Sequence, residues 1–108
     1  MLEFCKMDDT VLEHFCGGDG ALVAKMFVDD RNKILKGTLA PGASIGMHCH
    51  ETSSEMIFVL SGVGTMLYNG GEETLTFGTC HYCRKGESHS LRNNGTDDLV
   101  FYAVVPQQ

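Results

Sequence analysis

The sequence lacks several features that define whole classes of protein. It has no tryptophan and only 2 prolines. Its longest apolar run, residues 99–105, is far short of the roughly 20 residues that span a bilayer. Only 20 % of the residues are charged and 43 % are apolar, which fits neither a disordered chain nor a coiled coil. The 108 residues have room for one domain with one core.

Basic residues are also scarce. The chain has 8 Lys and Arg against 14 Asp and Glu, a net charge of −6 that repels phosphate backbones and anionic lipid surfaces. We therefore expect no nucleic-acid partner and no membrane partner. Residues 1–15 show no basic start, apolar signal core or cleavage site, so we expect a cytoplasmic protein. The cysteines are odd in number and scattered, which predicts mostly reduced thiols; they are Cys5, Cys16, Cys49, Cys80 and Cys83.

The chain is rich instead in short β-type runs separated by turn signals. The runs cover residues 21–28, 34–39, 56–60, 65–68, 74–77 and 99–105. The 13 glycines contribute to turns such as Asn69-Gly70, which suits a tight hairpin. No long helical pattern follows residue 16. This pattern predicts an all-β fold, an antiparallel sandwich or barrel, and not a βαβ sheet.

We divide the chain into an N-terminal segment, residues 1–20, and a single domain, residues 21–108. Residues 7–15 have apolar side chains at near-helical spacing, and Thr10 and Glu13 form a capping-box pattern. They predict a short helical segment, with an extended segment as the alternative. We expect this segment to pack against a partner.

Three histidines and one glutamate form a candidate metal site. On a strand, His48 and His50 project from one face and Cys49 from the other. Glu55 follows a turn at residues 51–54, which we expect to fold the next strand back alongside the first. Further along the chain, a glycine turn at residue 86 re-aims His89 inward. Imidazole and carboxylate ligands suit iron, manganese, nickel, cobalt or zinc, and an ion that takes six ligands keeps two positions open.

These residues lie in two motifs that resemble those of the cupins. Residues 42–62 match the first cupin motif at its glycine, His-x-His, glutamate and closing glycine. Residues 78–93 resemble the second motif, with Arg84 where the family usually has proline. The resemblance covers roughly residues 21–105. It implies a jelly-roll barrel (a double-stranded β-helix), usually a homodimer, with a divalent metal held inside by His48, His50, Glu55 and His89.

The stretch Cys80-His81-Tyr82-Cys83 allows several roles. In a strand its alternate residues face opposite ways, so one pair faces the interior. A redox or zinc-binding Cys-x-x-Cys needs a turn or a helix start, so we favour two packed thiols and leave redox activity open. His81 is either a hydrogen-bond donor to a metal ligand, a substrate contact, or a residue of the surface or dimer interface. His81 and Tyr82 are weak candidates for catalysis.

An anionic substrate would need a counter-charge, and no Lys or Arg occurs from residue 37 to 83. Arg84 is the most suggestive candidate because of its unusual place in the second motif, and it is also a weak catalytic candidate. The other candidates are Lys85, Arg92, Arg31, Lys33 and Lys36.

The cupin resemblance does not imply one reaction, because similar sites serve dioxygenases, isomerases, decarboxylases, lyases and binding proteins. We predict a metalloenzyme that acts on a small oxygen-rich substrate such as a sugar acid, keto acid or enediol. Isomerase or lyase chemistry is preferred over that of a dioxygenase. The candidates for a general base are His81 and Glu51, with Tyr68 and Tyr82 as further candidates. The alternative is a non-catalytic, metal-dependent protein that binds or senses a small ligand, and a purely structural metal ranks last.

Overall fold

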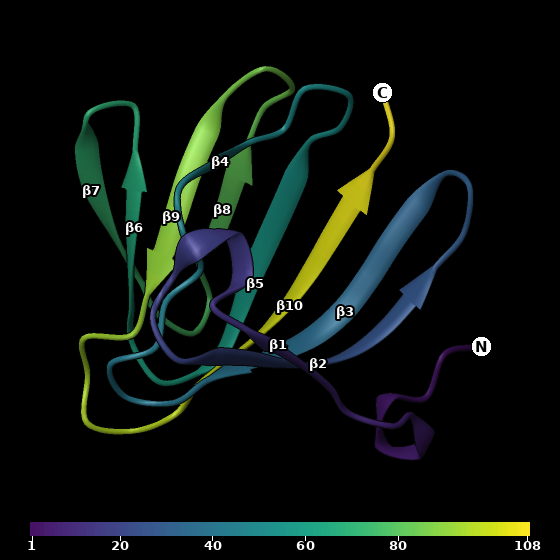
Figure 1. Ribbon diagram of the computed structural model, residues 1–108, viewed down its shortest axis with the longest axis horizontal. Coiled ribbons are helices and arrows are strands. Elements are labelled where there is room, and N and C mark those ends of the chain that lie inside the picture. The colour runs from purple at the N-terminus through teal and green to yellow at the C-terminus, as the bar shows by residue number, and fades with distance from the viewer.

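Two antiparallel sheets face each other in the computed structural model, which describes residues 1–108 (Figure 1). One sheet has six strands in the order β1-β2-β3-β10-β5-β8, and the other has four in the order β4-β9-β6-β7. The strands are β1 (Thr10–Glu13), β2 (Ala21–Val28), β3 (Asn32–Leu39), β4 (His48–Cys49), β5 (Glu55–Ser61), β6 (Gly64–Tyr68), β7 (Gly71–Leu75), β8 (Cys80–Cys83), β9 (Ser88–Arg92) and β10 (Leu99–Pro106). The all-β jelly-roll prediction is confirmed.

The β6–β7 hairpin shows how the local sequence sets the register. Asn69 and Gly70 have φ angles of 53° and 74°, the left-handed conformations of a two-residue hairpin turn. The turn brings Tyr68 opposite Gly71, so β7 begins at residue 71 and ends at residue 75. The prediction had placed this strand at residues 74–77. The strand β9 was not among the predicted runs, because its sequence Ser-His-Ser-Leu-Arg carries few β-type residues.

The prediction of a helical segment at residues 7–15 is wrong. The segment is extended instead, which was the alternative, and it contains the strand β1. The strand β1 pairs with β2 from Thr10 opposite Ala24 to Glu13 opposite Ala21. Two short 3₁₀ helices flank it, η1 (Phe4–Lys6) and η2 (Phe15–Gly17). So short a helix is marginal in water by itself, whereas the edge of β2 offers a full set of backbone partners. Residues 1–20 therefore add an edge strand to the larger sheet.

The core lies between the sheets. The inward positions of β10 alternate along the strand, as Leu99, Phe101, Ala103 and Val105. Apolar residues of both sheets meet them, among them Leu22, Leu35, Leu39 and Ile57 from the larger sheet and Met66, Leu75 and Leu91 from the smaller. None of the helices is both long and apolar enough to cross a bilayer.

Candidate metal centre

The fold brings His48, His50, Glu55 and His89 together inside the barrel. His48 on β4 lies directly opposite His89 on β9, and His50 follows one residue after β4 ends. The four side chains each offer a ligand atom, and these atoms all lie within 4.8 Å of one another. Cys49 is exposed on the opposite face, as the alternation of a strand predicts.

Glu55 reaches the three histidines from the other sheet. It begins β5, which pairs with β10 and β8 and not with β4. The expectation that the turn at residues 51–54 folds the next strand back alongside the first is therefore wrong. Within the turn, Ser53 forms a bridge with Gln107 just beyond β10, which draws the chain across to the larger sheet. The carboxylate thus faces the imidazoles across the barrel interior.

Three of the four donor atoms are spaced as neighbouring ligands of a six-coordinate ion. Glu55 Oε1 lies 3.1 Å from His50 Nε2 and 2.9 Å from His89 Nε2, and the two nitrogens are 3.0 Å apart. Ligands about 2.1 Å from an ion are about 3.0 Å apart at right angles and about 3.4 Å apart at the tetrahedral angle. The observed distances match neighbouring octahedral positions.

Two of the histidines are oriented by their remaining ring nitrogens. His48 Nδ1 lies 2.8 Å from the carbonyl oxygen of Gly46, to which it donates, and His50 Nδ1 lies 3.0 Å from Ser53 Oγ. These contacts occupy Nδ1 and leave Nε2 of each ring for the centre. Metal-bound histidines in proteins are typically held in this way.

His89 is oriented by a fourth imidazole, that of the buried His81. Its Nδ1 lies 3.0 Å from Nε2 of His81, and His81 Nδ1 lies 2.6 Å from a carboxylate oxygen of Glu73 on β7. The ring of Tyr68 packs edge-on against His81 with centroids 4.9 Å apart. His81 therefore touches a candidate ligand and not the centre itself. The sequence had suggested this role for His81, but no local signal pointed to Glu73.

The charge states suit metal binding, which requires an ionised carboxylate and neutral imidazoles. Burial raises the pKa of Glu55, but its hydrogen bonds with His50 and His89 outweigh burial and bring the pKa down to about 2. Burial lowers the pKa of His48 below its usual value. At neutral pH Glu55 is therefore ionised, and His48 favours its neutral form.

A cavity of about 90 Å³ lies beside this cluster. Its wall is mostly apolar and includes one basic side chain, that of Lys33. The lining residues are Phe15, Leu22, Lys33, Leu35, Ile45, His48, His50, Glu55, Phe101 and Val105.

The other sequence-predicted candidates lie outside the cavity. On β8, His81 and Cys83 face inward while Cys80 and Tyr82 face out, as strand alternation requires. Tyr82 is 45 % exposed, and the exposed Arg84 guanidinium lies 5.9 Å from the centroid of its ring. The structure therefore does not bring Tyr82 or Arg84 to the metal cluster. Glu51 is exposed as well.

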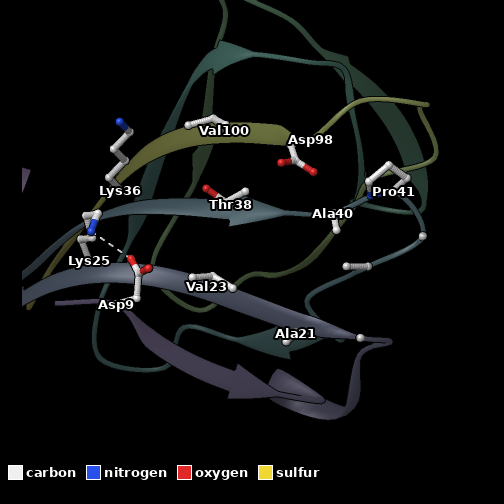
Figure 2. A pocket seen from close by; sticks show the side chains of 13 residues that line it. Asp9, Ala21, Val23, Lys25, Lys36, Thr38, Ala40, Pro41, Asp98 and Val100 are labelled. Carbon is white, nitrogen blue, oxygen red and sulfur yellow. Dashed lines mark ion pairs between the residues drawn. The ribbon is translucent and has the colours of Figure 1, made fainter. Parts of the chain in front are cut away.

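A larger concavity of about 770 Å³ lies on the outer face of the six-stranded sheet (Figure 2). Lys25 and Asp9 form an ion pair of 3.0 Å across it, and Lys25 also donates to the carbonyl oxygen of Met7. Lys36 projects from β3 on this side, as Figure 2 shows. The concavity shares no residue with the cluster of His48, His50, Glu55 and His89.

Comparison with known proteins places the chain in a family. The family model of the cupin domain (Cupin_2) matches residues 35–105, most of the barrel. The chain belongs to the cupin family.

A curated protein and a crystal structure, both from Thermotoga maritima, are similar to it. A protein named oxalate-binding protein is 40 % identical over 67 residues, 62 % of this chain and 55 % of the relative, so the match spans about half of the relative's length. The crystal structure of a predicted oxalate decarboxylase has a TM-score of 0.94 at 26 % identity, covering 100 % of this chain and 99 % of the other.

A regulator contains the same fold. The Cupin_2 domain of an XRE family transcriptional regulator from Enterobacter cloacae has a TM-score of 0.72 at 24 % identity. The match covers 81 % of this chain and 97 % of that domain. At this identity the likeness extends to the fold alone.

Proposed function

We propose that the protein binds one divalent transition metal ion through His48, His50, Glu55 and His89, and that the ion holds a small oxygen-rich molecule. The observation that carries this proposal is the convergence of three Nε2 atoms and one carboxylate on a single point, with every Nδ1 engaged elsewhere. Three imidazoles and a carboxylate suit iron, manganese, cobalt, nickel or zinc. Four protein ligands leave two positions of a six-coordinate ion for the molecule.

The ligand we favour is a small carboxylate anion. Oxygen atoms of such an anion are suitable ligands for the open positions of the ion. A relative with 40 % identity is named oxalate-binding protein, and the cavity beside the centre is small. These observations support a short carboxylate more than a large substrate.

Turnover of the ligand is the second candidate function. The right-angle spacing of the donors supports an ion with neighbouring open positions, which a metal-dependent isomerase, lyase or dioxygenase requires. When bound, the metal would supply Lewis-acid chemistry at a carbonyl, or redox chemistry where it is iron. Isomerase or lyase chemistry remains our preference. Of the remaining cavity side chains only Lys33 is ionisable, so it is the one group there that can exchange a proton with a bound molecule.

We also propose that the protein is a cytoplasmic homodimer. All five cysteines are free, which supports a reducing compartment. The outer face of the larger sheet exposes Phe58, Tyr82 and Tyr102, which supports a second copy of the chain as its cover.

Metal content and oxygen uptake test the proposal together. We expect protein purified without added metal or chelator to contain about one transition-metal ion per chain, and His89→Ala to lose it. Cys49→Ala is the matched control, since it alters the exposed residue between two ligands and leaves metal content unchanged. Full metal retention in His89→Ala would refute the four-ligand site. Oxygen uptake with a panel of keto acids and enediols separates dioxygenase chemistry from the rest.

A further inference from the structure

Lys33 is a cation on the inner face of the larger sheet. Along β3, every second residue from Leu35 through Gly37 to Leu39 is buried, and Lys33 shares their face. Its partners across the sheet are Val28 and Val105, and Val105 lines the same cavity as Lys33.

The Lys33 ammonium group has no anionic partner. The ion pairs of the other lysines join Lys6 to Glu3 and Lys25 to Asp9, and no carboxylate lies within 4.0 Å of Lys33 Nζ. The carboxylate of the cavity, Glu55, is hydrogen-bonded to two histidines. An ammonium group at an apolar cavity without a counter-ion favours the entry of an anion.

Phe15 holds the ammonium group over the cavity. Lys33 Nζ lies 5.5 Å from the centroid of the Phe15 ring, a cation–π distance. The carbonyl oxygen of Phe15 accepts hydrogen bonds from the backbone N–H groups of Gly18 and Gly46, 3.1 Å and 3.0 Å away. These bonds fix η2 across the cavity. The positive charge therefore lies against the Phe15 ring, at a cavity that His48, His50 and Glu55 also line.

The size of the cavity and the chemistry of its wall limit which molecule can bind both the metal ion and Lys33. A cavity of about 90 Å³ is well below the roughly 300 to 1,000 Å³ of pockets that take drug-sized ligands. Leu22, Leu35 and Phe101 in its wall offer no hydrogen-bond partners for the hydroxyl groups of a sugar. A short acid can bind the metal ion through the oxygen atoms of one end and place a carboxylate at its other end near the Lys33 ammonium group.

We infer that Lys33 is the specificity residue of this site and that the site takes short-chain carboxylates, such as oxalate, glyoxylate or pyruvate, in preference to sugar acids. The inference rests on the proposed metal centre and adds to it the residue that recognises the anionic end of the ligand. It also separates Lys33 from the other basic candidates, because no other Lys or Arg lines the cavity.

The test is titration calorimetry on metal-loaded protein, with Lys33→Met compared with Lys36→Met. Lys36 is the matched control, because it lies on the same strand but belongs to the concavity on the outer face of the sheet. The probes are oxalate, glyoxylate, pyruvate and glucuronate, titrated into protein reconstituted with Mn²⁺, Co²⁺, Ni²⁺ or Zn²⁺. Metal content and the melting temperature are measured for each variant.

We expect Lys33→Met to keep its metal and its fold, and to bind the short acids at least tenfold more weakly. Lys36→Met should bind them as the wild type does, and Lys33→Arg should recover part of the affinity. Equal affinity of Lys33→Met and the wild type overturns the inference, as does tighter binding of glucuronate than of any short acid. A wild type that holds none of these four metals, and no Fe²⁺ under anaerobic conditions, overturns the proposed function instead, so the two failures are distinct.

Discussion

The imidazoles of His81 and His89 are directly linked, with Nε2 of the first 3.0 Å from Nδ1 of the second. His81 is buried, with 1 % of its side chain exposed, while its other partner, Glu73, is 47 % exposed. A metal on Nε2 of His89 requires the proton of that ring on Nδ1, which donates to His81. His81 then carries its proton on Nδ1 and donates it to Glu73. One surface carboxylate thus determines the orientation of two imidazoles and the donor nitrogen of the second.

We predict that removing this link weakens metal binding without abolishing it. His81→Phe should lower metal affinity about 10- to 100-fold, the usual effect of removing a partner that orients a ligand. Glu73→Gln should cause a smaller loss, because an amide accepts a weaker hydrogen bond than a carboxylate. Competition with a chromogenic chelator measures both.

The neighbouring glutamate provides the control. Glu72 is exposed on the same strand and lies opposite Leu67 in the register. The hydrogen bonds of His81 go to Glu73 and His89 and not to Glu72, so Glu72→Gln should bind metal as the wild type does. If His81→Phe and the wild type hold the metal with equal affinity, the link does not serve the centre.

The parts of this site that the sequence predicts are those governed by local geometry. The two-residue period of a strand puts His48 and His50 on one face, and the turn at Gly86, with a φ angle of 86°, precedes His89. Glu55 was predicted as a ligand, but its approach from the opposite sheet was not, because the pairing of β5 depends on contacts far away in the sequence.

The remaining parts depend on long-range contacts. Glu73 meets His81 only because β7 and β8 lie in different sheets whose inner faces approach each other. Lys33 was one of six basic candidates, and nothing in its neighbours marks it until β3 takes its place in the sheet. Arg84 had the more unusual sequence context, yet it lies on the surface. The pairing of the strands, and not the local sequence motif, therefore determines which basic side chain lines the cavity beside the candidate metal centre.

We predict that Cys83 resists alkylation in the folded protein. Burial raises the pKa of its thiol to about 12, with Glu55 and Glu87 adding to the effect, so the nucleophilic thiolate is absent at neutral pH. Iodoacetamide at pH 8 should modify the exposed Cys5 and Cys49 and leave Cys83 intact until denaturant is added. Mass spectrometry of the labelled peptides measures this, and rapid native labelling of Cys83 would contradict it.

The same shift predicts a pH dependence of stability. The folded protein keeps the Cys83 proton at pH values where the unfolded chain, with a thiol pKa near 9.0, loses it. The protonated Cys83 thiol therefore contributes fully to the free energy of unfolding below pH 9.0, and this contribution disappears as the pH rises toward 12. In urea unfolding, Cys83→Ala should therefore lose less stability between pH 8 and 10 than the wild type. An identical slope for both proteins would contradict this.

We predict that Phe58→Asp converts a dimer into a monomer. Phe58 is 45 % exposed, lies opposite Tyr102 in the register, and Tyr102 in turn stacks on Phe4 with centroids 5.3 Å apart. A charge at the centre of this aromatic face opposes its burial against a second copy. Light scattering should give twice the chain mass of 11.8 kDa for the wild type. The control Phe77→Asp should give the same mass, because Phe77 is 78 % exposed and lies on a turn. A monomeric wild type would exclude the dimer.

We predict that Gly46→Ala disrupts the packing of η2 over the cavity. A Cβ atom at Gly46 would lie 1.9 Å from the carbonyl oxygen of Cys16, and both groups belong to the backbone, so neither can turn aside. Gly46 also accepts the hydrogen bond from His48 Nδ1, so its displacement frees a candidate ligand. Overpacking of this kind costs about 1 to 3 kcal/mol.

The loss should be visible in two measurements at once. The urea midpoint of Gly46→Ala should fall, and so should its metal affinity, because the residue that supports Phe15 also orients His48. Gly71→Ala is the control: its Cβ would meet the nearest atom at 3.8 Å, an ordinary contact, so both quantities should stay close to those of the wild type. A lower midpoint with unchanged metal affinity would mean that η2 stabilises the barrel without supporting the metal centre.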